Sequence, residues 1–412
     1  MGLSRGRRAL ATALALALCA RAAPVVAQEF SVRGYLDLRA GFAADEDSWV
    51  DGGLGKTRFG GGDAFASGNA ALAAHWQLTP ALSAAAQLQF SPQQDPAVDV
   101  LDAYVAYRPV STTPWRWSAK VGAFFPPISQ ENDGIGWTSP WTLSPSAIDS
   151  WVGEELRTVG VEARLQHRGD IADVEAFGAI YGGNDPAGEL LAARGWSLGD
   201  LTSGLAARVR EPDVYAPLAE ASVPVRYRPF DEIDGRLGWY AGVAVDAPAY
   251  GKLSLLRYDN RGDPTREEEF DGRDVYAWHT RFWSLGGQAQ LGDVIVAAQA
   301  MHGDTAFEPA PGLLLDTHFH AGYLLAAWAR GTWRPAVRLD MFDLHQRPDT
   351  LSAPLSEHGN ALTVALNWRP TDRVRVTAEW LRVDSTRDQR ALAELAPRQL
   401  DRQCQLGLRL LF

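Results

Sequence analysis

A strict alternation of apolar and polar side chains in the C-terminal part of the chain constrains its fold more than any other feature. Every second residue is apolar across residues 362–368, a tight turn follows at residues 370–372, and the alternation resumes across residues 374–380. The last segment repeats the pattern up to Phe412, the final residue of the sequence. A period of two places successive side chains on opposite faces of a β-strand. The sequence therefore predicts antiparallel strands with one apolar and one polar face.

The N-terminus has the pattern of a secretory signal peptide. Arginines within residues 5–8 precede an apolar run at residues 9–20, and small residues at 25–27 form a cleavage site. An N-terminal membrane anchor is the alternative, but this run is shorter than the roughly 20 residues that span a bilayer. We therefore expect residues 1–27 to be cleaved and residues 28–412 to form one domain.

Composition excludes several classes of protein. After the N-terminus, no stretch of the sequence is long and apolar enough for a transmembrane helix. The formal net charge of -11 argues against a nucleic-acid partner, because neutralising phosphates requires a basic surface. Of the two cysteines, Cys19 lies in the expected signal peptide, so that only Cys404 remains and no internal disulfide can form.

Short motifs for cofactors and catalysis do not fit this chain. The Gly-Lys-Thr at residues 55–57 resembles the end of a phosphate-binding loop, but Val50 stands where the first glycine of that loop is required. His318 and His320 could place two imidazoles on one strand face as metal ligands, although histidines near a loop are more often solvated rim residues. We therefore expect no enzyme activity, no cofactor and no metal.

Two architectures accommodate amphipathic strands of this kind. In a soluble sandwich the apolar faces of two sheets pack together, whereas in a membrane barrel the apolar face contacts lipid and the polar face lines a lumen. The signal peptide, the terminal aromatic residue and the uneven lengths of the connections favour the barrel. In these features residues 28–412 resemble the outer-membrane porins of Gram-negative bacteria. The resemblance implies that Phe412 is the assembly signal, and that the partners are the barrel-assembly machinery, outer-membrane lipid and lipopolysaccharide.

The number and spacing of the strand segments agree with a closed barrel, which in bacteria has an even number of strands. The connections after even-numbered segments are short, whereas those after odd-numbered segments are mostly long. We expect the short ones to be periplasmic turns and the long ones to be extracellular loops. The long segment 182–236 leaves room for one further hairpin. The sixteen segments are residues 31–42, 65–78, 82–90, 98–108, 115–124, 156–167, 171–181, 237–246, 252–259, 278–291, 294–302, 318–329, 332–344, 360–369, 373–383 and 402–412.

The polar faces of these segments would line the lumen, and basic residues outnumber acidic ones there. Closure of the barrel brings the last strands beside the first, which would gather several arginines into one cationic stripe at the seam. Alternatively, the arginines are solvated and paired with nearby acids, and the sequence leaves both interpretations open. The candidate basic pore residues are Arg33, Arg39, Arg116, Lys120, Arg373, Arg375 and Arg409, with Arg108, Arg164, Lys252, Arg334 and Arg338 on the same face. The acids on that face are Asp37, Asp102, Glu162, Asp173, Glu175, Asp340 and Glu379.

One long connection, residues 125–155, is acidic and contains no lysine or arginine. In sixteen-stranded porins the loop at this place folds into the barrel and narrows it. The resemblance therefore implies a constriction in which loop acids face wall arginines and orient small polar solutes. A loop folded outward as an extracellular cap is the alternative. The acids of this loop are Glu131, Asp133, Asp149, Glu154 and Glu155.

The function that the resemblance implies is passive diffusion of small hydrophilic solutes or ions through a water-filled channel. A solute-specific channel and a polymer-export channel are the alternatives, and a homotrimer is the assembly expected by analogy with the family. Phosphate-selective porins are a more distant comparison, because their basic loops contrast with the acidic loops here. Fold analogy does not fix the solute, and the basic wall and the acidic loops act on ion preference in opposite directions.

Overall fold

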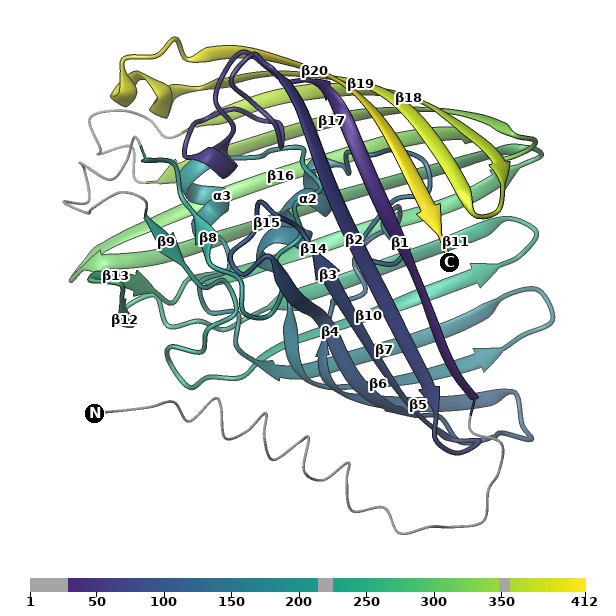
Figure 1. Cartoon of the computed structure of the whole chain (residues 1–412). Coiled ribbons are helices and arrows are strands. Elements are labelled where there is room, and N and C mark those ends of the chain that lie inside the picture. The colour runs from purple at the N-terminus through teal and green to yellow at the C-terminus, as the bar shows by residue number, and fades with distance from the viewer. Residues whose placement is uncertain (1–28, 214–224, 348–355) are drawn as a thin grey trace.

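The computed structural model describes residues 29–213, 225–347 and 356–412. Sixteen antiparallel strands close into one barrel, and the last strand pairs with the first (Figure 1). This confirms the predicted fold class and strand number. The barrel strands are β1 (Glu29–Phe42), β2 (Ala64–Gln77), β3 (Leu82–Phe90), β4 (Val98–Tyr107), β5 (Trp115–Phe124), β6 (Thr158–Arg168), β7 (Asp173–Gly182), β10 (Gly238–Ala247), β11 (Gly251–Asp259), β14 (His279–Leu291), β15 (Val294–Ala310), β16 (Leu313–Trp328), β17 (Trp333–Arg347), β18 (Glu357–Thr371), β19 (Val374–Arg387) and β20 (Arg398–Leu411).

The connections at one end of the barrel carry further short elements. Figure 1 shows tight turns at the right-hand end, the small sheets at the left-hand end, and the two α-helices within the outline of the barrel. In the described residues, no helix is long and apolar enough to cross a membrane. The additional elements are α2 (Ala147–Glu155), α3 (Glu189–Arg194), the 3-10 helices η1 (Trp49–Asp51) and η3 (Asp388–Ala393), and the paired strands β8 (Val209–Arg210) with β9 (Arg226–Tyr227) and β12 (Glu267–Phe270) with β13 (Arg273–Tyr276).

The predicted alternation separates the two faces of the sheet. On β20, Leu406, Leu408 and Leu410 are exposed on the outer face, while Gln405 and Arg409 are buried on the inner face. Exposed large apolar side chains occur on strands all around the barrel. Such a band is stable in lipid, where a closed sheet also leaves no backbone edge unpaired.

Aromatic side chains accompany the short turns. Trp333 and Trp368 face each other across β17 and β18 with ring centroids 5.9 Å apart, and Tyr107 and Trp117 lie 5.4 Å apart across β4 and β5. All four are exposed on the outer face. Amphipathic rings at this position suit the level of the lipid headgroups.

One expectation about the long connections is corrected, and the alternative of a further barrel hairpin in residues 182–236 is not borne out in the described residues. The strands expected to end at residue 302 and to begin at residue 318 continue as β15 and β16, and a tight turn at Gly312, with φ of 81°, joins them. Where segment 182–236 is described, it forms α3 and the small β8–β9 sheet and adds no barrel strand. The expected signal peptide, residues 1–27, lies outside the described residues.

The largest cluster of buried apolar side chains lies inside the barrel. It joins inward-facing residues of β5, β7, β10, β11 and β14 to β19 with α2. The indole of Trp151 on α2 lies with its centroid 5.7 Å from the ring of Phe282 and 5.2 Å from that of Phe319. A hydrophobic core that includes α2 therefore fills part of the lumen.

Candidate functional site

The long connection after β5 lies against the inner wall of the barrel. Gln299 on β15 donates to the Ile128 carbonyl over 3.0 Å, and the Leu143 amide donates to Glu379 on β19 over 2.5 Å. Further along, the Ala147 amide donates to Asp340 on β17 over 3.2 Å. Because these partners point inward from the wall, residues 125–157 cross the lumen; we name this segment the first inward loop.

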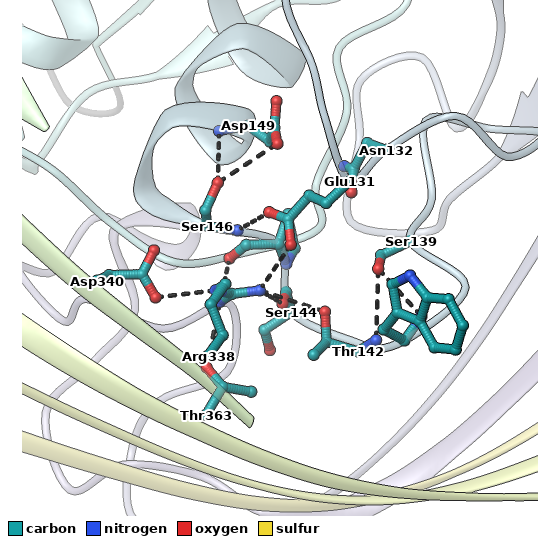
Figure 2. Close-up of polar contacts among 12 residues, drawn as sticks. Glu131, Asn132, Ser139, Thr142, Ser144, Ser146, Asp149, Arg338, Asp340 and Thr363 are labelled. Atoms are coloured by element: carbon teal, nitrogen blue, oxygen red, sulfur yellow. Dashed lines mark hydrogen bonds and ion pairs between the residues drawn. The ribbon is translucent and has the colours of Figure 1, made fainter. Parts of the chain in front are cut away.

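The arginine at the centre of these contacts is Arg338 on β17 (Figure 2). Its Nε donates to Asp340 over 2.8 Å, and its Nη1 lies 3.2 Å from a carboxylate oxygen of Glu131 in the loop. The same guanidinium donates to the carbonyls of Ser144, over 2.7 Å, and Pro145, over 2.8 Å. The side chains of Arg338 and Glu131 are fully buried. The result is a desolvated ion network that fixes the loop to the wall.

The helix α2 forms in the C-terminal part of the first inward loop. Ser146 caps it, because its Oγ accepts from the Asp149 amide over 3.2 Å. At the other end Glu155 accepts from the indole nitrogen of Trp151 over 2.6 Å and from the Tyr227 hydroxyl over 2.5 Å. Every residue of α2 is buried.

A second connection, residues 183–210, lies over the first. Its Gly199 amide donates to the Ser150 hydroxyl over 3.0 Å, and its Arg194 forms an ion pair with Glu154 of α2. Asp200 lies 2.6 Å from Arg39 on β1 and 3.1 Å from Arg58. We name this segment the second inward loop. The sequence analysis missed it, because its partners are far away in the sequence and no local pattern marks them.

The expected arginine stripe at the seam forms only in part. Arg39 and Arg409 share Asp37, with N–O distances of 3.0 and 2.5 Å, and Arg375 stands directly opposite Arg409 in the strand register. Arg33 and Arg373, by contrast, are exposed near the turn end of the barrel. The seam therefore combines a buried cluster of arginines around Asp37 with exposed arginines at the turn end of the barrel.

The other predicted basic residues, Arg116 and Lys120, lie on β5 on the opposite side of the lumen. There Glu162 on β6 lies 3.1 Å from Lys120 and 2.6 Å from Arg164, and Arg164 reaches Glu175 at 2.8 Å. Side-chain exposure is 18% for Lys120, 28% for Arg164 and 25% for Glu175. This side retains ionisable groups that solvent reaches.

The predicted loop acids do not create a field across open water. Glu131 forms an ion pair with Arg338, and Glu154 forms one with the second inward loop. Glu155 accepts a hydrogen bond from a hydroxyl group of the loops. Burial, with Glu131 nearby, raises the pKa of Asp149 well above its usual range. Only Asp133 among the five is exposed. The acids are buried because α2 and its flanks pack into the lumen instead of standing clear of the wall.

A group of carboxylates occurs at the loop end of the barrel. Asp185, Glu232 and Asp234 each place one oxygen within 4.8 Å of the others. Asp185 accepts from the Ile233 amide over 2.5 Å, and burial raises its pKa to about 7 with neighbouring Glu232 acting in the same direction. Of the pair considered as metal ligands in the sequence, His318 lies 3.2 Å from Asp316, whereas the ring of His320 stacks on that of His302.

The terminal residue completes the seam. The Gly34 amide donates to the Phe412 carbonyl over 2.9 Å, and the Phe412 amide donates to the Gly34 carbonyl over 3.1 Å. The Phe412 side chain is exposed on the outer face. The last residue thus belongs to the β1–β20 junction that closes the barrel.

The comparisons with known proteins rest on structure, since no protein-family model and no curated protein match the chain. The outer membrane channel DcaP of Acinetobacter baumannii superposes with a TM-score of 0.57 at 10% identity, over 93% of this chain and 97% of that one. OmpF of Salmonella typhi, in a complex with daunomycin, gives 0.51 at 10% identity over the same shares. OmpT of Vibrio cholerae, expressed in the outer membrane, gives 0.50 at 12% identity, over 95% of this chain and 100% of that one.

The closed sheet, its apolar outer band and these likenesses define the class of protein: an outer-membrane β-barrel. Within that class the chain has a porin-like fold. This confirms the porin-like fold that the resemblance implied, and the apolar outer band agrees with the predicted outer-membrane location.

Proposed function

We propose that this protein is a passive outer-membrane channel through which small hydrophilic solutes or ions diffuse. The supporting observation is the partly exposed ionisable wall inside the barrel, formed by Lys120, Arg164 and Glu175. Charged side chains on the inner face of a membrane barrel favour a hydrated path, because lipid surrounds only the outer face. The proposal includes no catalytic step.

A solute-specific channel is the second candidate, and the second inward loop favours it. Residues 183–210 add a further layer over α2, and Arg194 and Asp200 fasten that layer to the first loop and to the wall. A lumen filled in this way selects solutes by size and charge and disfavours the passage of a bulky polymer. The polymer-export alternative is therefore the weakest of the three.

The proposal extends to assembly. A homotrimer would place outer faces of neighbouring barrels in contact, and Phe412 would act as the signal for barrel insertion because it stands at the closing strand. Chemical cross-linking of the protein in native membranes tests the trimer. Removing Phe412 tests the signal through the amount of heat-modifiable barrel in the outer membrane.

The channel itself is tested by single-channel conductance and reversal potential of the refolded protein in a planar bilayer under a salt gradient. Steady openings with a reproducible ionic preference support the proposal. Silence from a barrel that is folded by heat-modifiability would overturn it, and a gated or non-conducting role would replace it.

Deleting residues 132–150 of the first inward loop sharpens this test. If the loop limits the aperture, conductance rises severalfold, since the segment fills lumen that would become water. The matched control is deletion of residues 309–312, at the tip of the hairpin that joins β15 and β16. Equal conductance in both variants would contradict the constriction.

A further inference from the structure

Three arginines on neighbouring strands lack an acidic partner. Arg334, Arg369 and Arg375 lie on β17, β18 and β19, near the turn end of the lumen. Among the described residues, no carboxylate lies within ion-pair distance of any of the three. Arg409, Arg369 and Arg39 all lie close enough to act on the charge of Arg375, and so does the acid Asp37. Positive charge therefore exceeds negative charge at this place.

The acid Asp37 is already engaged. Asp37 lies 3.0 Å from Arg39 and 2.5 Å from Arg409. The strand register sets Arg375 directly opposite Arg409, so that two like charges face each other across the sheet. Such a pair is destabilising unless a counter-charge lies between or beside the two groups.

The guanidinium groups are also incompletely hydrogen-bonded. Arg375 donates through Nη1 to the Ser139 carbonyl over 3.1 Å, and Arg369 donates through Nη2 to the Pro140 carbonyl. The remaining buried donors, Nε and Nη2 of Arg375 and Nε of Arg369, have no partner among the described residues. Arg375 is only 6% exposed. A buried cation with free donors is costly, and an anion at those donors would remove the cost.

We propose that Arg375 and Arg369, with Arg334 at the edge, bind an oxyanion, the carboxylate or phosphate group of a small solute. A guanidinium presents a planar fork of N–H donors that matches two oxygens of such a group. The site lies between β17–β19 and residues 138–141 of the first inward loop. The inference deepens the proposed function, and it rests on that function for the route by which the solute arrives.

A solute would reach the site from the turn end of the barrel. Arg334 and Arg369 are only partly buried, and Arg373 at the adjacent turn is exposed. These side chains extend the positive charge from the buried guanidinium of Arg375 to the rim. An anion is therefore attracted along a continuous basic path to the free donors.

The test is calorimetric titration of the refolded, full-length mature protein in detergent. Sodium phosphate and sodium succinate are the two probes, with sodium chloride at the same ionic strength as the reference. We expect saturable heat with at least one oxyanion and none with chloride. The probe that binds more tightly identifies the phosphate or the carboxylate as the preferred group.

Variants assign the binding to the cluster. Arg375→Gln and Arg369→Gln should each weaken oxyanion binding about tenfold or more, because each removes a charge and free donors. Arg168→Gln is the matched control, because Arg168 is an exposed arginine at another short turn, and its affinity should stay within about twofold of the unmodified protein. If Arg375→Gln does not refold, oxyanion binding by Arg369→Gln tests the site, because Arg369 is only partly buried.

The site is refuted if the unmodified protein binds neither oxyanion more tightly than chloride, or if both cluster variants bind as it does. This result is separable from the channel itself. Conductance without oxyanion binding removes only the site, whereas binding without conductance supports the site and removes the proposed channel.

Discussion

The two sides of the lumen use one sequence pattern in different ways. On the side of β5 to β7, which we name the solvated wall, inward ionisable residues pair mainly with one another, and Arg164 keeps 28% of its side chain exposed. On the side of β14 to β20, which we name the loop-covered wall, Arg338 is fully buried and binds the first inward loop. Alternation alone therefore fixes which way a side chain points, whereas the segment lying over it decides whether the side chain meets water or protein.

This difference has an energetic consequence. A partly exposed ion pair contributes about 0–1 kcal/mol, because water screens it and the side chains lose freedom. A buried pair is held in place by the cost of leaving either charge alone, which is several kcal/mol. The loss of stability caused by matched substitutions should therefore differ between the two walls. The following changes test this comparison, from the largest expected effect to the smallest.

Replacing Arg338 with Met should have the largest effect. The change leaves Glu131 and Asp340 as buried acids without their cation, and we expect it to lower the free energy of unfolding by about 3–5 kcal/mol. The measurement is urea unfolding of the barrel in lipid vesicles, followed by tryptophan fluorescence.

A rescue variant checks the reason for that loss. Adding Glu131→Gln and Asp340→Asn to Arg338→Met removes the unpaired charges, and part of the lost stability should return. A loss of less than about 1 kcal/mol for Arg338→Met would mean that the loop-covered wall is solvated like the other one.

The second prediction concerns pH and the second inward loop. The pKa of Asp185 is raised to about 7 from its ordinary value of 3.8, chiefly by burial. The folded state therefore prefers the neutral acid, so that its stabilising contribution is complete below about pH 4 and is lost as pH rises through about 7. The thermal unfolding midpoint should fall between pH 5 and 8 by more in the unmodified protein than in Asp185→Asn.

An exposed acid provides the control for that experiment. Asp133 lies on the first inward loop and is exposed, so Asp133→Asn should leave the pH dependence as it is. Equal slopes in Asp185→Asn and the unmodified protein would show that Asp185 ionises as freely in the folded state as in the unfolded state.

The barrel strands could be predicted from the sequence because lipid imposes a regular requirement on them. β3 and β5 begin and end at the predicted residues, 82–90 and 115–124. The prediction failed where the membrane no longer sets the pattern. On β16 the unrecognised residues are 313–317, where Leu313 and Leu314 are both exposed and Leu315 is buried, so that apolar and polar side chains do not alternate there. Beyond the bilayer the outer face is in water, so this strand was recognised only from residue 318.

The candidate site was predictable in its residue types but not in its pairs. The acidic loop and the inward arginines are visible in the sequence, yet Glu131 and Arg338 are 207 residues apart. Which of the wall arginines pairs with Glu131 depends on the path of the loop across the lumen, and this path brings Glu131 to Arg338. The contacts of Arg194 and Asp200 depend on a second layer packed over the first, for which no period or motif gives a signal.

The smallest effect is expected on the solvated wall. Arg164→Gln removes the contacts to Glu162 and Glu175, but Glu162 keeps Lys120 at 3.1 Å and the Tyr240 hydroxyl at 2.5 Å. Because water reaches the site, the free energy of unfolding should fall by only about 0.5–1 kcal/mol. In a bilayer under a salt gradient, the loss of one cation should move the reversal potential slightly towards cation preference.

Salt distinguishes the two walls even if these losses prove similar in size. The Debye length falls from about 10 Å at 0.1 M salt to about 3 Å at 1 M, and this screening acts on groups in contact with water. The effect of Arg164→Gln should therefore fade as salt rises over that range, whereas the effect of Arg338→Met should persist because its network is buried. Parallel salt dependence in the two variants would show that water reaches both arginines, and the inward loop would then lie against the wall without sealing it.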